Sequence, residues 1–116
     1  MKFFNTAKGK KETFQPDKKN LGLYICGPTV YSDTHLGHAK SYVSFDVLKR
    51  WLIYNKYEVN HIQNFTDVSD ETALGASKAG VNEFIFTQKY ESEFLEKMNL
   101  LSNTSATKYT RASEFV

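Results

Sequence analysis

Apolar and polar residues alternate with two different periods along this chain, and the changes of period divide it into strands and helices. An apolar run over 21–26 has the length of a strand and lies between Asn20 and Gly27. Such a run is typical of a buried central strand. Over 37–55 the apolar residues recur with helical spacing, which predicts an amphipathic helix.

The rest of the chain continues this alternation, which predicts an α/β fold with parallel strands and crossover helices. We expect 1–116 to form one domain or part of one. Ligands of such sheets bind beyond the carboxyl ends of the strands. The remaining predicted elements are edge strands at 2–5 and 12–15, a turn at Pro16 and Asp17, a strand at 58–63, a polar turn at 64–71, helices at 72–78 and at 83–100 (capped by Asn82), and a helix beginning near Tyr109.

The helical spacing also selects a core. Val43, Val47 and Trp51 recur every fourth residue, so we expect this stripe to face inward, and we assign Trp51 and the tyrosines to packing. Asp46 and Arg50 can pair on the exposed side of the same helix. The other expected core residues are Leu48, Leu52, Phe84, Phe94, Leu95 and Met98.

Composition narrows the class of protein. The net charge of +2 is too small to indicate a nucleic-acid-binding surface by itself. A single cysteine excludes an internal disulfide, and no apolar stretch approaches membrane-spanning length. We therefore expect a cytoplasmic protein without a membrane segment. Five lysines gather near the amino end and predict a solvated arm: Lys8, Lys10, Lys11, Lys18 and Lys19.

The candidate chemistry begins where the first apolar strand ends. Cys26 closes that strand, and His35 and His38 stand three residues apart at the start of the following helix. Imidazoles at a helix start can donate hydrogen bonds to phosphate oxygens, and Gly37 lets a ligand approach the backbone. Surface histidines at a helix cap, and a cysteine that is only a small buried residue, remain the alternative interpretations. The spacing does not match the metalloprotease pair.

A second polar segment follows the strand at 58–63. Asn64 and Thr66, with Asp67 and Asp70, can form a turn or can orient a substrate. Because the carboxyl ends of parallel strands share one edge, we expect Cys26 and Asn64 to lie close together. We further expect the cysteine sulfur and the two imidazoles to share one crevice there.

Taken together, CGPTVYSDTHLGHAKSYVSFDVLKR and HIQNFTDVSD resemble the amino-terminal part of the catalytic domain of the cysteinyl-tRNA synthetases, which are class I aminoacyl-tRNA synthetases. His-Leu-Gly-His at 35–38 resembles the class I HIGH motif, and the opening KFFNT resembles the start of that family. The resemblance implies a Rossmann-like nucleotide-binding fold, incomplete relative to the family. It also implies ATP- and Mg-dependent activation of L-cysteine to cysteinyl-adenylate, followed by transfer to tRNA(Cys).

The same resemblance implies roles for individual residues. Cys26 would be the first ligand of a zinc ion that binds the substrate thiolate. His35 and His38 would be catalytic, and together with Gly37 they would bind ATP. The residues implied in binding cysteine and the adenylate are Gly27, Thr29, Ser41, Asn64 and Thr66.

The sequence departs from the family in several places. Ser32, Ser69 and Glu71 replace the usual aspartate, aspartate and lysine. The KMSKS loop, the later zinc ligands and the tRNA-binding domains do not occur in these residues, so we expect no activity from the chain alone. tRNA(Cys) would then be bound through downstream domains, and a complementary fragment or self-association would cover the exposed surface. A mycothiol-type cysteine:amino-sugar ligase and a non-catalytic fragment that binds a nucleotide or a partner are the alternative interpretations.

Overall fold

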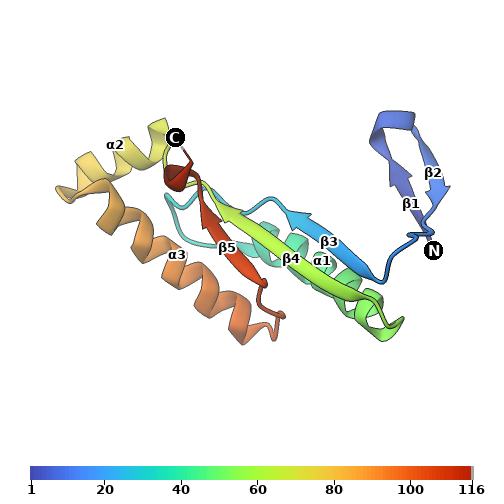
Figure 1. Cartoon of the computed structure of the whole chain (residues 1–116). Helices are drawn as coiled ribbons and strands as arrows, with labels where there is room; N and C mark the ends of the chain where they lie inside the picture. The colour runs from blue at the N-terminus through green and yellow to red at the C-terminus, as the bar shows by residue number, and fades with distance from the viewer. Residues whose placement is uncertain (116) are drawn as a thin grey trace.

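The structure is a computed structural model that describes residues 1–115, and its centre is a three-stranded parallel sheet (Figure 1). The strands lie in the order β3-β4-β5, which confirms the predicted α/β class with crossover helices. The elements of this part are β3 (Asn20–Ile25), α1 (Leu36–Tyr54), β4 (Glu58–Phe65), α2 (Asp70–Ala79), α3 (Glu83–Leu100) and β5 (Lys108–Arg111).

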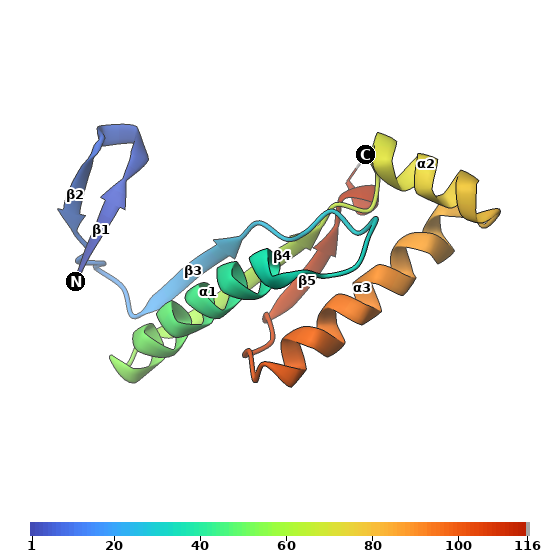
Figure 2. The same ribbon diagram turned by 180° about the vertical axis from the view of Figure 1, so that it is seen from behind.

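The register of the sheet decides which side chains meet the helices. Ile25 pairs with Gln63, and Phe65 pairs with Arg111. Helices α1 and α3 cover the same face of the sheet, as the two opposite views show (Figures 1 and 2). Side chains along β4 alternate in burial, with His61, Gln63 and Phe65 buried. The opposite face of the strand carries Asn64.

The core lies between the sheet and the two helices. Phe65 is fully buried, and its ring lies edge-on to Phe94 (centroids 5.6 Å apart) and stacks on Tyr109 (5.5 Å). Burying one such aromatic side chain stabilises the fold by about 1.5–3 kcal/mol. The remaining buried members of this cluster are Ile25, Val30, Tyr42 and Met98, and Leu95 packs against it. Phe94, Met98 and Leu95 therefore lie where the sequence placed them, whereas Phe84 is 56% exposed.

The buried face of helix α1 agrees with the prediction only in part. Leu52 and Tyr42 are buried, as expected, whereas Val47 is 62% exposed and Trp51 49% exposed. Lys49, which the pattern did not select, also faces inward, where its ammonium group donates a hydrogen bond to the carbonyl oxygen of Ser105 at 2.6 Å. A stem of four methylene groups can cover apolar surface, so a lysine can occupy a position that a hydrophobicity pattern reserves for an apolar residue.

The prediction of a helix beginning near Tyr109 is wrong, because this segment forms β5 and a short 3-10 turn, Ala112–Glu114. The backbone groups of β4 form hydrogen bonds with this segment, and these bonds explain why it is a strand and not a helix. The amide of Thr107 donates to the carbonyl oxygen of His61, and the amide of His61 donates to the hydroxyl of Thr107. Pairing with an open sheet edge overrides local helical preference.

The amino-terminal segment forms a separate antiparallel hairpin that lies apart from the main sheet (Figure 1). Its strands are β1 (Lys2–Asn5) and β2 (Lys10–Thr13), so the second strand begins two residues before the predicted one. Lys8 pairs with Glu12 at 2.9 Å, and the lysines of this arm are exposed, as predicted. None of the described helices is long and apolar enough to cross a bilayer.

Candidate functional site

The carboxyl ends of β3 and β4 are joined by one side chain. The Asn64 side-chain oxygen accepts a hydrogen bond from the Gly27 amide at 2.9 Å and another from the Tyr24 hydroxyl at 2.7 Å. Its side-chain nitrogen donates to the Thr66 hydroxyl at 3.4 Å. The expected proximity of the two strand ends is therefore confirmed, and Asn64 holds the first residue after Cys26.

Gly27 is required here by a close approach of two backbones. A Cβ atom at this position would lie 1.4 Å from the carbonyl oxygen of Asn64. No side chain fits in that space, so the segment after β3 can lie against β4 only with glycine at this position.

The segments that follow the two strands also pair with each other. Thr29 and Thr66 form a parallel bridge, in which the Thr66 amide donates to Pro28 and the Val30 amide donates to Thr66. Beyond this bridge, the long connection between β3 and α1 runs past the end of the sheet and returns to the start of α1 (Figure 2). The structure thus brings Gly27, Thr29, Asn64 and Thr66 together in one network.

Helix α1 begins at an unusual cap. His35 is the N-cap, and its Nδ1 accepts a hydrogen bond from the Gly37 amide at 3.1 Å. His38 completes a reciprocal arrangement, because its Nδ1 accepts from the His35 amide at 3.3 Å. An imidazole nitrogen can therefore do the work of the usual serine or aspartate oxygen.

These caps fix the tautomers of both rings. Because Nδ1 accepts in each imidazole, the proton of the neutral ring lies on Nε2. The two rings stack with their centroids 4.0 Å apart and an angle of 21° between their planes. Burial, and then the nearby His35, holds the pKa of His38 below its ordinary value, so His38 is neutral at pH 7. Two parallel N–H donors at the positive end of a helix dipole can bind an anionic group.

Cys26 lies at the same end of the sheet as this helix start. Its carbonyl oxygen accepts a hydrogen bond from the Tyr42 hydroxyl at 3.1 Å, and Tyr42 follows His38 by one helical turn. Burial raises the pKa of Tyr42 above its usual value, so the hydroxyl remains a donor. The thiol itself is exposed, and its nearest polar contact is the Gly27 carbonyl oxygen at 3.8 Å.

A groove of about 240 Å³ beside His35 is lined by Thr34 and Ala39 and by the end of α3, including Lys97. Cys26 is not among the residues that line this groove, so the expected crevice shared by its sulfur and the two imidazoles stays a prediction. Ser41 is exposed on α1, one turn after Gly37, and does not join the Asn64 network.

The described residues do not form a zinc site. Within residues 1–115 there is no group of three or more His, Cys, Asp or Glu side chains that could hold a metal ion. Cys26 supplies one thiol, whereas zinc requires three or four protein ligands. The residues present therefore do not fit a complete zinc centre.

Three site residues were missed by the sequence analysis. Tyr24 and Tyr42 were assigned to packing, yet their hydroxyls hold Asn64 and Cys26. The position of Tyr42, one turn after His38, was a usable signal. Ser113 binds Asp67 in the segment after β4, but no local pattern predicts a contact between residues so far apart.

Comparisons with known proteins identify the family of the chain. A sequence model of the tRNA synthetases class I (C) catalytic domain matches residues 13–116. A cysteine–tRNA ligase of Chlamydia pneumoniae is 42% identical over 98% of this chain, and one of Oenococcus oeni is 43% identical over all of it. The chain covers 24% and 25% of these two relatives, about a quarter of their length.

Solved structures show the same fold. Mycobacterium tuberculosis methionyl-tRNA synthetase with methionyl-adenylate superposes with a TM-score of 0.71 at 20% identity, covering 79% of this chain and 18% of that one. An Agrobacterium radiobacter leucyl-tRNA synthetase in a ternary complex gives 0.70 at 23% identity, covering 84% and 13%. With the family match over nearly all of its residues, the chain belongs to the class I (C) tRNA synthetase catalytic-domain family, whose curated relatives here are cysteine–tRNA ligases.

Proposed function

We propose that this chain is the amino-terminal part of a cysteine–tRNA ligase catalytic domain, where ATP and L-cysteine bind and react to form cysteinyl-adenylate. The observation that carries the proposal is the convergence of the Asn64 network and the capped start of α1 at one end of the sheet. The high identity to cysteine–tRNA ligases over the whole chain supports the choice of amino acid.

In this proposal the triphosphate of ATP, with its Mg ion, lies at the start of α1. The Nε2–H groups of His35 and His38 donate to phosphate oxygens, and Gly37 allows the phosphates to approach the backbone. Adenylate formation is an in-line displacement at the α-phosphorus, with pyrophosphate as the leaving group. Positioning and stabilisation of the developing negative charge are the main contributions of these residues.

The cysteine and adenylate moieties lie beside the strand ends. Gly27 and Thr29 line the amino-acid pocket, and Asn64 and Thr66 hold the substrate amino group and the adenylate, with Ser41 at the border of the site. Cys26 is the residue of this chain assigned to metal binding. Because the chain spans about a quarter of its relatives, contacts with tRNA(Cys) are assigned to parts of such a protein outside these residues. The unpaired cysteine supports a cytoplasmic location.

Calorimetric titration tests the proposal. The 116-residue chain is titrated with ATP and with cysteinyl-sulfamoyl-adenosine, a non-hydrolysable analogue of the adenylate. We expect the chain to bind both ligands and to show no cysteine-dependent ATP–pyrophosphate exchange by itself. His38→Ala weakens ATP binding, whereas Ser92→Ala, on the exposed side of α3, does not. If the chain binds neither ligand, the proposal is contradicted. Strong ATP–pyrophosphate exchange by this chain contradicts the expected inactivity.

A further inference from the structure

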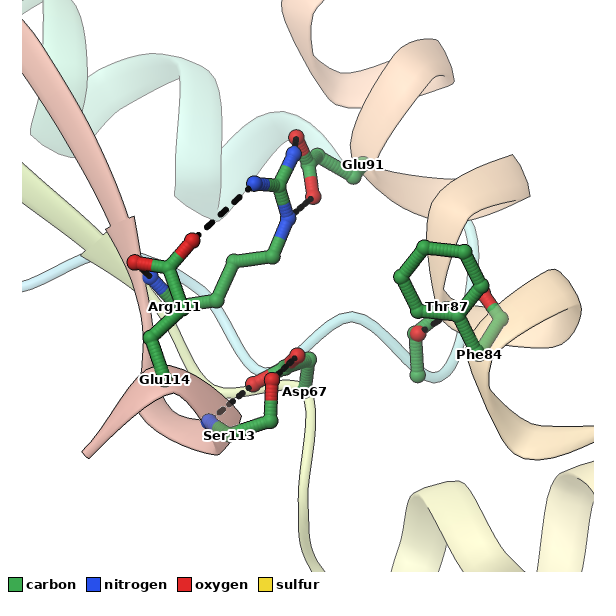
Figure 3. Close-up of polar contacts among 7 residues, drawn as sticks. All are labelled: Asp67, Phe84, Thr87, Glu91, Arg111, Ser113 and Glu114. Carbon is green, nitrogen blue, oxygen red and sulfur yellow. Dashed lines mark hydrogen bonds and ion pairs between the residues drawn. The ribbon is translucent and has the colours of Figure 1, made fainter. Parts of the chain in front are cut away.

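We propose that Ser113 and Asp67 form a positioning pair that sets the geometry of the Asn64–Thr66 segment, an inference that rests on the proposed function. Asp67 is only 5% exposed and directly follows Thr66 in the chain. Both of its oxygens are occupied by one residue: Oδ1 accepts from the Ser113 amide at 3.0 Å, and Oδ2 accepts from the Ser113 hydroxyl at 2.5 Å (Figure 3).

Ser113 is itself held in place by an ion pair between the end of β5 and helix α3. Arg111, at the end of β5, binds Glu91 of α3 through two parallel hydrogen bonds of 2.9 and 2.6 Å. The same guanidinium contacts Glu114 at 3.5 Å, and the Arg111 amide donates to Glu114 at 3.3 Å (Figure 3). A bidentate contact to a mostly buried carboxylate is geometrically restrictive, so the 3-10 turn that carries Ser113 is fixed to α3.

From Asp67 the contacts continue to the site. Thr66 exchanges backbone hydrogen bonds with the segment after β3, at 3.0 Å to the Pro28 carbonyl oxygen and 3.2 Å from the Val30 amide. Thr66 also accepts from the Asn64 side chain, which in turn holds Gly27. Two hydrogen bonds to the Asp67 carboxylate restrict the orientation of this residue. Because Thr66 is its neighbour in the chain, the position of Thr66 is restricted as well.

The pair does not reach the start of α1 through these contacts. His35 and His38 are oriented by their own reciprocal cap. Ser113 and Asp67 are therefore positioning residues for the amino-acid side of the site, and the phosphate side is independent of them. This separation distinguishes positioning from a general contribution to stability, which would affect both sides.

Three serine variants of the full chain test the inference. Ser113→Ala removes the hydroxyl, Ser113→Thr retains it, and Ser92→Ala removes an exposed hydroxyl elsewhere. We expect Ser113→Ala to shift the amide NMR resonances of Thr66, Asn64 and Gly27. It should weaken binding of cysteinyl-sulfamoyl-adenosine by roughly threefold to tenfold, and it should weaken binding of ATP, which lacks the amino-acid part, by less. Ser113→Thr and Ser92→Ala should match the wild type.

Two results overturn the inference: unchanged resonances of Thr66 and Asn64 in Ser113→Ala, or equal loss of affinity for ATP and for the adenylate analogue. The proposed function fails separately. If the wild-type chain binds neither ligand while the Ser113→Ala resonances shift as expected, the positioning pair stands and the ligand assignment falls.

Discussion

The amide nitrogen of Gly27 lies 2.9 Å from the side-chain oxygen of Asn64, and this single hydrogen bond joins residues that are 37 positions apart in the chain. The bond orients the Asn64 amide group, whose nitrogen then donates to Thr66. It also holds the segment after Cys26 against β4. One side chain thus sets the relative position of two strand ends that carry most of the candidate amino-acid-binding residues.

Replacing Gly27 tests this close approach. Gly27→Ala places a methyl group 1.4 Å from the Asn64 carbonyl oxygen, so the two strand ends must separate. We expect a loss of about 3 kcal/mol or more in the free energy of unfolding, measured by urea denaturation. Gly22→Ala on the same strand is the matched control, because its Cβ would meet no atom within 4 Å. Its stability should equal or slightly exceed that of the wild type, and equal losses in both variants would contradict the explanation.

The helix cap and the proposed phosphate contact of His35 can be separated. His35→Ala removes the acceptor for the Gly37 amide, and we expect a loss of about 1 kcal/mol in stability. His35→Asn supplies a different cap acceptor but no Nε2–H donor in the same place. We expect near wild-type thermal stability with weakened ATP binding. If His35→Asn binds ATP as the wild type does, the imidazole acts only as a cap.

We expect His61 to make the stability of the chain depend on pH. Both of its ring nitrogens are buried without a hydrogen-bond partner, beside a cavity of about 220 Å³ between the sheet, α1 and α3. Burial first, and the positive charge of Lys49 second, lower the pKa of His61, while Asp46 opposes this shift. The unfolded chain therefore binds a proton more readily than the folded chain. Stability should be constant above the ordinary pKa of 6.5 and should fall as the pH drops below it.

The measurement is urea unfolding of wild type and His61→Leu at about pH 7.5 and about pH 5.5. His38 titrates in the same direction, because its pKa is also lowered. The difference between the two proteins thus isolates His61. We expect a smaller loss of stability on acidification in His61→Leu, and an identical loss in both proteins would contradict the assignment.

Adjacent residues on α1 test its observed orientation. Leu52 is 5% exposed, so Leu52→Ala should cost about 2–5 kcal/mol. Trp51→Ala should cost about 1 kcal/mol or less, because the indole is half exposed and packs mainly on Tyr54, with centroids 5.9 Å apart. Trp51 is the only tryptophan, so its fluorescence should be quenched readily by iodide. A protected indole, or a larger loss in Trp51→Ala, would favour the predicted stripe.

Local patterns were sufficient for much of the fold. Helix α3 begins and ends where the Asn82 cap and the spacing predicted. Helix α2 spans Asp70–Ala79, two residues earlier at its start and one later at its end than predicted, and is capped by Gly80 in the left-handed conformation. Asp46 and Arg50 pair at 2.6 Å, as their spacing predicted. These features depend on residues within one helical turn of each other. Their spacing in the sequence is therefore enough to predict the contacts.

Features that depend on distant partners were not predicted. The segment at Tyr109 became a strand because β4 offered an open edge, and Lys49 replaced an apolar residue because a carbonyl oxygen of the α3–β5 connection accepts its hydrogen bond. In the site, the strand ends could be foreseen from topology alone. The hydroxyl groups of Tyr24 and Tyr42 could not, because each binds a partner on another element.

The alternation of side chains along β4 places Phe65 in the core and Asn64 beside Gly27. Inserting a single residue within Glu58–Gln63 would reverse this assignment, driving an amide into the aromatic cluster and a phenyl ring toward Gly27. Mispairing of β4 would therefore disrupt the candidate site and destabilise the fold at the same time. We expect such a variant to unfold rather than to remain folded with a disrupted site.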